Sequence, residues 1–305
     1  MSLKDIKGKI QSIGRTRKVT KAMEAVSAVK MRKTQTRALS GRPYAKAAFT
    51  VLRQLSASLK TSAHPLTTDR PASRATLIVA TSDKGLCGTL NAAVLKEAER
   101  LLTELALPVK QVSVYAFGKK AAEYFERRSY VLAGRYENVR DDVTASEVQA
   151  LAEEVSRSFE NSQTDAVYIL YTNFKSTFEQ KPVTHRLLPL NIEDLSRLVE
   201  GIYVRNEVRA SEEATPAPAF YTSESDSTEL LSVLLPKLVG VSIYHALIES
   251  KASEHSARMV AMKNASDKSK DLSKLLTRKF NKARQAMITR EVSEIVGGIE
   301  AMASS

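Results

Sequence analysis

The stretch that most constrains the fold runs from Glu249 to the end of the sequence at residue 305. It has no proline, and its first glycines are Gly297 and Gly298, so no helix breaker interrupts it for nearly fifty residues. Helices in compact domains usually run about 8–20 residues, so this length is typical of a coiled coil or a stalk. At about 1.5 Å per residue, the helix would extend roughly 80 Å. Its apolar residues recur at helical spacing, and they are Leu272, Leu276, Phe280, Ala283, Ile288, Val292, Ile295, Ile299 and Met302.

A second long helix is predicted from residue 3 to about residue 60. Its apolar stripe begins with Leu3, Ile6, Ile10 and Ile13. The stripe lapses over residues 14–17 and resumes with Val19, Met23 and Val26, which is the phase shift that a stutter gives a coiled coil. Pro43 predicts a kink within this helix. Because neither terminal helix can bury its stripe alone, we expect the two to pair as an antiparallel coiled coil.

In the middle of the chain, the spacing of apolar residues is no longer that of one long helix, and the pattern predicts an α/β domain. Short apolar runs alternate with amphipathic helices, which favours a Rossmann-like fold with a mostly parallel sheet. Strands are expected at 76–81, 109–116, 130–132, 166–172 and 181–190, the last two as an antiparallel pair, and helices at 91–105, 119–127 and 145–160.

The predicted α/β domain is inserted in the sequence between the two long helices, which form a helical hairpin. The C-terminal helix is expected to begin between Ser227 and Lys237, and a short helix is expected at 192–199. The predicted boundaries are 1–60 for the N-terminal coiled-coil helix, 61–74 for a linker, 75–208 for the α/β domain, 209–228 for a loop and 229–305 for the C-terminal coiled-coil helix.

Positive charge is concentrated at the two ends of the chain. The formal charge is +12, and residues 1–60 hold 15 Lys and Arg against Asp5 and Glu24. Residues 258–290 add ten basic residues against Asp267 and Asp271. Basic helices of this kind suit nucleic acid, an anionic membrane surface or an acidic protein surface.

One apolar segment, residues 230–248, is long enough to be considered as a transmembrane helix. It carries one formal charge over nineteen residues, but Pro236, Lys237, Gly240 and His245 interrupt it and no aromatic belt flanks it. A helix buried on most sides fits this pattern better. The Lys- and Arg-rich start also suits a transit peptide, but it continues without a break into the long helix, so we treat it as mature protein.

The turn SDKGLCG at residues 82–88 follows a strand and precedes a helix, where phosphate-binding loops lie. It matches neither of the two glycine-rich nucleotide-binding patterns, G-x-G-x-x-G and G-x-x-x-x-G-K-[ST]. The sequence therefore favours a tight structural turn, built by Asp83, Lys84, Gly85, Cys87 and Gly88. Cys87 is the single cysteine and is expected to be a partly buried structural thiol.

No catalytic constellation can be assembled from the remaining residues. Four scattered histidines lack metal-ligand spacing, and Glu254-His255 fits a solvated helix face better than a catalytic pair. We therefore expect no catalytic residue, no cofactor and no metal. The basic cluster at 30–33 could contact phosphates, but aromatic residues are nearly absent there, so no nucleic acid is expected as a partner.

Three long segments together resemble the gamma subunits of F-type ATP synthases. They are IKGKIQSIGRTRKVTKAMEAVSAVKMRKTQ (6–35), TSDKGLCGTLN (81–91), and SEHSARMVAMKNAS with FNKARQAMITREVSEIVGGIEAM within 253–302. They occur in family order and span both ends and the middle of the chain. The segments at 61–74 and 205–230 resemble nothing in particular.

The resemblance implies the central rotor shaft of the synthase, a non-catalytic subunit. In that family the paired terminal helices lie inside a ring of three alpha and three beta subunits, with one gamma per ring. The α/β domain contacts the epsilon subunit and the membrane c-ring. Proton flow turns ring and shaft together, and the shaft drives ATP synthesis or, in reverse, hydrolysis at the beta-subunit sites. A bacterial origin would place the complex at the inner (plasma) membrane, peripherally and on the cytoplasmic side.

The resemblance also implies which residues contact the beta subunits. Met23 matches a position that faces an acidic loop of beta, although its helical spacing also fits a core residue. Arg258, Arg284 and Gln285 match polar contacts to beta. Thr289 and Glu294 match neighbours within the helix pair, and we include them in the same contact set.

The sequence departs from the family pattern at three places. Gly14-Arg15 replaces a more usual Lys or Gln followed by Asn, and Lys268 stands where Asn is common. Because Cys87 is alone, the regulatory cysteine pair of chloroplast members is missing and thiol control is not expected.

Two other functions remain open from the residues alone. One is a Rossmann-like enzyme with helical oligomerisation arms, which the absent glycine fingerprint disfavours. The other is a basic coiled-coil nucleic-acid binder, which would bind DNA with a steep salt dependence.

Overall fold

The computed structural model describes residues 2–61, 64–190 and 227–303. The chain forms two compact units, one of Met1–Ser27 with Arg258–Ser305 and one of Ala28–Ala257. Two helices contribute to both units, α1 (Leu3–Thr61) and α7 (Ser227–Ala303), and each is continuous as the sequence predicts. The helix α1 runs through Pro43 without a break.

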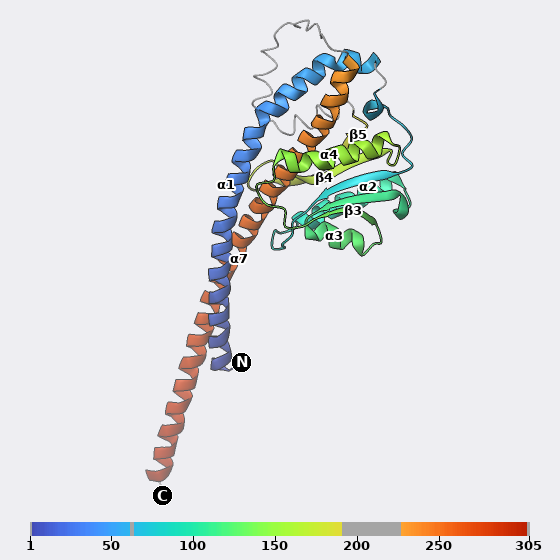
Figure 1. Cartoon of the computed structure of the whole chain (residues 1–305). Coiled ribbons are helices and arrows are strands. Elements are labelled where there is room, and N and C mark those ends of the chain that lie inside the picture. Colours follow the sequence, from blue (N-terminus) through green and yellow to red (C-terminus); the bar gives the residue numbers. More distant parts are fainter. Residues whose placement is uncertain (1, 62–63, 191–226, 304–305) are drawn as a thin grey trace. The chain divides into compact units, whose positions relative to one another are not determined.

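The larger unit is built on a five-stranded sheet (Figure 1). Its strands are β1 (Ala75–Ala80), β2 (Val112–Phe117), β3 (Val131–Tyr136), β4 (Ala166–Phe174) and β5 (Gln180–Leu188). The order is β3-β2-β1-β4-β5, parallel except for the antiparallel edge strand β5. This confirms the predicted mostly parallel sheet and the predicted antiparallel pair.

Alternate residues of β1 point into two separate cores, since side chains along a strand face opposite sides of the sheet. Leu77 and Val79 pack with α2 (Leu90–Leu105) and α3 (Lys119–Glu126). Ile78 and Ala80 pack with α4 (Ala145–Glu160) and α7. Burial on both faces explains why the strand reads as a continuous apolar run.

Most predicted elements lie where the sequence placed them, with two corrections. Residues 109–111 do not begin a strand, because they form the short 3-10 helix η2 (Val109–Gln111) directly after Pro108. The third strand, expected at 130–132, extends to Tyr136. Gly134 gave no strand signal, but its missing side chain leaves room for the ring of Tyr115, which a Cβ would meet at 2.6 Å.

The linker predicted at 61–74 contains the 3-10 helix η1 (Pro65–Thr67), which buries Leu66 in the core of the larger unit. The short helix expected at 192–199 lies outside the described residues. So does the loop expected at 209–228, apart from its last two residues, which belong to α7.

The apolar segment at 230–248 is a core helix of the larger unit. Its buried residues, which pack against the sheet and α4, are Leu235, Leu238, Val239, Ile243, Ala246 and Leu247. By length and composition, the part of α7 over Ser232–Ile299 could cross a membrane, but 61% of its most apolar window is buried inside the protein. The burial agrees with the sequence interpretation of a mostly buried helix.

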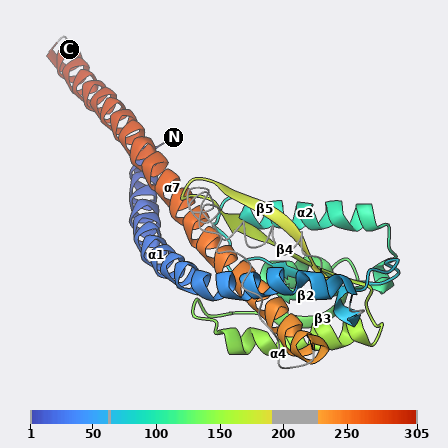
Figure 2. The same ribbon diagram turned by 90° about the horizontal axis from the view of Figure 1, so that it is seen from above.

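The smaller unit is a pair of antiparallel helices, the first part of α1 beside the last part of α7 (Figure 1, Figure 2). The predicted stutter in α1 is wrong, because Val19 and Val26 are 58% and 56% exposed. The buried positions Ile6, Thr20 and Ser27 are instead separated by fourteen and seven residues, and the half-buried Ile13 lies midway in the longer interval. Thr20 tolerates burial because its hydroxyl donates to the Arg17 carbonyl at 3.1 Å, within its own helix.

Gly118, at the start of α3, gives a stability prediction. Its φ is +89°, and an added Cβ would lie 2.3 Å from the Thr81 carbonyl oxygen. We expect Gly118→Ala to lower the free energy of unfolding by at least about 1–3 kcal/mol, the usual cost of one strained backbone position. Urea unfolding followed by circular dichroism measures the change.

The matched control is Gly14→Ala, in a helix interior where an added Cβ meets nothing within 4 Å. It should stabilise its helix by about 0.5–1 kcal/mol, since glycine costs that much in a helix. Equal unfolding midpoints for Gly118→Ala and the wild type would refute the steric argument.

Candidate coupling surfaces

The last part of α7 presents an exposed apolar surface in the smaller unit. Ala283 is the last half-buried residue, and every described side chain from Arg284 to Ile299 is exposed. Figures 1 and 2 show α7 continuing beyond the start of α1, which accounts for the exposure. The exposed large apolar residues there are Met287, Ile288, Val292, Ile295, Val296 and Ile299. A contiguous apolar surface of this kind marks an interaction site.

Basic side chains cover the outside of the same helix pair. In its α1 part, Lys4, Lys7, Lys9, Arg15, Arg17, Lys18 and Lys21 are all exposed. Lys21 forms an ion pair with Glu24 at 3.1 Å within the helix. An exposed surface with this excess of positive charge attracts acidic partners and speeds their association.

Of the six residues predicted to contact a partner, four lie on the exposed end of α7. Arg284 and Gln285 have exposed side chains. The Thr289 hydroxyl donates to the Gln285 carbonyl at 3.0 Å, and the Glu294 carboxylate pairs with Arg290 at 2.8 Å. Four polar groups are therefore presented along about three turns of one helix.

The other two predicted contact residues differ from these four. Met23 is half-buried, so part of its side chain is accessible. Arg258 is only 8% exposed and interacts within this chain. Their contacts to a partner stay predictions.

The turn after β1 is held by hydrogen bonds within the protein. The Ser82 amide donates to the Asn91 side-chain oxygen at 2.9 Å, and the Asn91 side-chain nitrogen donates to the Cys87 sulfur at 3.3 Å. The Asp83 carboxylate accepts from the Lys119 amide at 3.0 Å, which places negative charge at the N-terminus of α3. Gly88 has a φ of +63°, and Lys84 and Gly85 are exposed. The carboxylate therefore occupies the N-terminus of α3, whereas the helix that directly follows the turn is α2.

Cys87 gives a prediction on thiol reactivity. The side chain is 2% exposed and lies 3.6 Å from the Ser82 hydroxyl. We expect a thiol reagent such as DTNB to modify the native chain at least about 100-fold more slowly than the urea-unfolded chain, because reaction requires local opening. Equal rates in the two states would contradict the burial.

A polar cluster on Asp141 was missed by sequence reasoning. The Asp141 carboxylate lies 2.8 Å from Lys30 Nζ of α1 and 2.8 Å from His255 Nε2 of α7. Its backbone carbonyl accepts from Arg37 Nη1 at 2.9 Å. Hydrogen bonding to His255, and then to Lys30, holds the pKa of Asp141 well below its usual range, so the carboxylate is charged at neutral pH.

The prediction that Glu254-His255 lies on a solvated helix face is wrong, since the two residues are 7% and 4% exposed. A usable signal was present in the sequence. Ile248, Ala252, His255 and Met259 continue a stripe at intervals of four, three and four residues, which is the spacing of a buried helix face.

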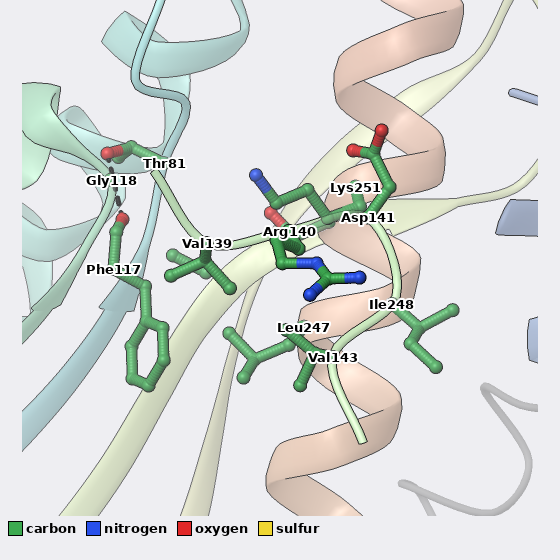
Figure 3. A pocket seen from close by; sticks show the side chains of 12 residues that line it. Thr81, Phe117, Gly118, Val139, Arg140, Asp141, Val143, Leu247, Ile248 and Lys251 are labelled. Carbon is green, nitrogen blue, oxygen red and sulfur yellow. Dashed lines mark hydrogen bonds between the residues drawn. The ribbon is translucent and has the colours of Figure 1, made fainter. Parts of the chain in front are cut away.

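A small cavity lies at the carboxyl ends of β1 and β2, the edge where doubly wound folds bind nucleotides (Figure 3). Thr81 and Gly118 line it from the sheet, and Val139 and Asp141 line it from the loop after β3. Leu247, Ile248 and Lys251 of α7 close the other side. The cavity volume is about 20 Å³, room for about one water molecule. It is too small for a nucleotide.

Comparison with known proteins agrees with the sequence resemblance. The profile of the family described as ATP synthase matches residues 2–302. The ATP synthase gamma chain of Pelotomaculum thermopropionicum is 38% identical over 301 residues, and that of Chloroflexus aurantiacus is 38% identical over 306 residues. Each alignment covers 99% of both chains.

Two solved structures share the fold. A chain of the Tetrahymena thermophila mitochondrial ATP synthase central stalk and c-ring matches with a TM-score of 0.59 and 25% identity, covering 81% of this chain and 99% of that one. A chain of the Euglena gracilis mitochondrial ATP synthase matches with a TM-score of 0.63 over 98% of this chain and 94% of that one. At 20% identity, the second match concerns the fold alone. The fold of a central stalk and the full-length match to gamma chains together make this chain a member of the ATP synthase gamma chain family.

Proposed function

We propose that this chain is the central rotor shaft of an F-type ATP synthase. It couples proton-driven rotation of the membrane c-ring to ATP synthesis, or in reverse to hydrolysis, at the beta-subunit catalytic sites. The observation that carries the proposal is the exposed basic and apolar surface on a helix pair whose helices, α1 and α7, also belong to the α/β unit. Because each helix is continuous, motion of the α/β unit passes to the helix pair through covalent, hydrogen-bonded structure.

The shaft acts as a non-catalytic subunit. At the edge of the sheet where doubly wound folds bind nucleotides, the cavity between the described residues has room for about one water molecule, and Asp83 in the neighbouring turn accepts a hydrogen bond at the N-terminus of α3. In this proposal, catalysis belongs to the surrounding subunits, and this chain changes their conformations. The shaft must contact each catalytic site differently, since only differential contacts can shift a site between states.

The helix pair has the asymmetry that this mechanism needs. One helix exposes Val19 and Val26 among basic residues, while the end of the other exposes Ile288, Val292 and Ile295. When such a pair turns inside a ring of three equivalent sites, each site meets a different surface at any moment. The proposed contact residues on beta are Met23, Arg258, Arg284, Gln285, Thr289 and Glu294.

The proposed partners are three alpha and three beta subunits for one copy of this chain, together with the epsilon subunit and the membrane c-ring. Support comes from the solved Tetrahymena assembly, which comprises the central stalk and c-ring, and from the Euglena assembly, which comprises OSCP, F1 and the c-ring. The bacterial origin of the two similar gamma chains named above supports a peripheral position on the cytoplasmic side of the inner membrane.

Co-expression with the matching alpha and beta subunits tests the proposal. Size exclusion with subunit counting should find one copy of this chain for three beta subunits, and the ATPase activity should depend on its presence. If the alpha and beta subunits assemble and hydrolyse ATP equally well without it, the proposal fails.

A further inference from the structure

Two helices and a loop meet at one charged residue, Asp141, in the larger unit. The loop joins β3 to α4 and carries Asp141 between Val139 and Val143, which pack on the core beneath it. Lys30 and Arg37 reach Asp141 from α1, and His255 reaches it from α7. One short loop thus bonds to both of the helices that continue into the helix pair.

The loop has little freedom to follow either helix. Arg140 and Asp142 pair across it at 2.8 Å. Its far end is fixed by a capping box, in which the Thr144 amide donates to Glu147 at 2.8 Å and the Glu147 amide donates to the Thr144 hydroxyl at 3.3 Å. Figure 3 shows this loop crossing beside α7, with Val143 close to Leu247. A rigid loop holds the carboxylate in place for its partners.

Within the residues whose side chains the structure describes, which for α1 end at residue 37, the two helices make different contacts to the α/β unit. Apolar side chains such as Leu238 and Ile243 bury α7 directly on the sheet. From α1, by contrast, two long cationic side chains extend to the Asp141 loop. The His255 side chain is 5% exposed and gives Asp141 a buried partner on α7, so the Asp141 carboxylate bridges the two helices.

We propose that the Asp141 cluster, with Lys30, Arg37 and His255, is the joint that fixes α1 to the α/β unit and to α7, so that the two helices turn together under load. The proposal rests on the rotor function above. Asp141 and Lys30 are positioning residues, because they lie in the α/β unit and act on the catalytic sites only through the helices. Without the joint, α1 can slip when the α/β unit is driven against resistance.

Lys30→Gln is the decisive variant, because the Lys30 side chain is 49% exposed and its loss leaves the fold intact. It removes the cation that α1 offers to the Asp141 carboxylate. Lys33→Gln is the matched control, with the same change of charge one turn later on an exposed position of the same helix. Asp141→Asn tests the other partner of the ion pair, and Asp69→Asn is its control, because Asp69 is exposed and lies outside the Asp141 loop. Lys30→Arg keeps the charge and should keep the joint.

The complete synthase is reconstituted in vesicles for each variant, and two rates are measured. We expect ATP hydrolysis in uncoupled vesicles, where the shaft turns without load, to equal the wild-type rate. ATP synthesis driven by an imposed proton gradient should fall about fivefold or more in Lys30→Gln, the lower range for one coupling interaction. Lys33→Gln and Lys30→Arg should synthesise at the wild-type rate.

Hydrogen exchange gives an independent readout of the joint. Amides of residues 138–143 should exchange roughly 10-fold or more faster in Lys30→Gln, since a charge-assisted hydrogen bond is lost. Unchanged synthesis and exchange in Lys30→Gln would overturn the joint, as would a parallel fall in hydrolysis and synthesis. If the wild-type chain itself supports neither rate, the rotor function fails instead. The two failures are therefore distinguishable.

Discussion

Replacing Arg284 and Gln285 together by alanine should lower the ATPase activity of the assembled complex by about 10-fold or more, without changing the stability of this chain. Both side chains are exposed and bond to no other described residue, so their loss costs the fold nothing. Across an interface, truncating a hydrogen-bonded charged group costs about 2–5 kcal/mol, which is tenfold or more in an equilibrium. The Thr289 bond survives because it uses the Gln285 backbone carbonyl.

The measurement is ATP hydrolysis by the reconstituted complex, with the unfolding midpoint of the free variant chain beside it. Arg278→Ala is the matched control, since it removes an exposed arginine from the same helix outside the predicted contact set. A double variant with wild-type hydrolysis in a correctly assembled complex would remove both residues from the proposed contacts.

Asp165→Ala should destabilise the α/β unit by about 3–5 kcal/mol, the cost of removing one partner from a buried charged network. The Asp165 carboxylate accepts from the Ser73 and Arg74 amides at 3.0 and 2.9 Å, and it lies 3.5 Å from Arg70 Nε. Arg70 also stacks on the Phe159 ring, 4.2 Å from its centroid. Without Asp165, two amides lose their acceptor and a largely buried guanidinium keeps no counter-charge.

Urea unfolding of the full chain measures this loss. Asp69→Ala is the control, because Asp69 is 74% exposed and pairs with Arg186 at 3.5 Å at the surface. An exposed pair contributes about 0–1 kcal/mol, so this control should unfold close to the wild type. If the two aspartate variants were equally stable, the network around Asp165 would contribute no more than a surface pair.

Local signals in the sequence predicted much of the fold. The helix at 145–160 was predicted to the residue from its amphipathic pattern, and the structure shows that a capping box of Thr144 and Glu147 begins it. The strands of the sheet were recognisable because burial on both faces requires continuous apolar residues. The third strand was shortened in the prediction because Gly134 has no side chain to signal a strand.

Tertiary contacts decided what local signals could not. In α1, the apolar Val19 and Val26 suggested the buried seam, whereas the structure buries the small hydroxyl residues Thr20 and Ser27. Hydroxyl groups that bond within their own helix can enter a helix interface, which a count of apolar residues does not detect. Asp141 was missed for a similar reason, since its partners lie 111 and 114 positions away in the sequence.

The contact surface was predictable only in part, because its partner is a separate chain. Arg284, Gln285, Thr289 and Glu294 are exposed as expected for residues that await a partner, but exposure does not say which subunit they meet. The exposed isoleucines at the end of α7 give a clearer signal. Apolar side chains are unfavourable in water, so their presence there indicates a surface that a partner covers.

Single-molecule rotation tests the central claim most directly. Lys110 is exposed in the α/β unit, and the native Cys87 is buried, so a Lys110→Cys variant can carry a bead on one reactive thiol. The alpha and beta subunits are fixed to a surface and ATP is added. The rotor function predicts rotation of the bead in one direction that stops when ATP is removed. A motionless bead on complexes that hydrolyse ATP at the full rate would contradict it.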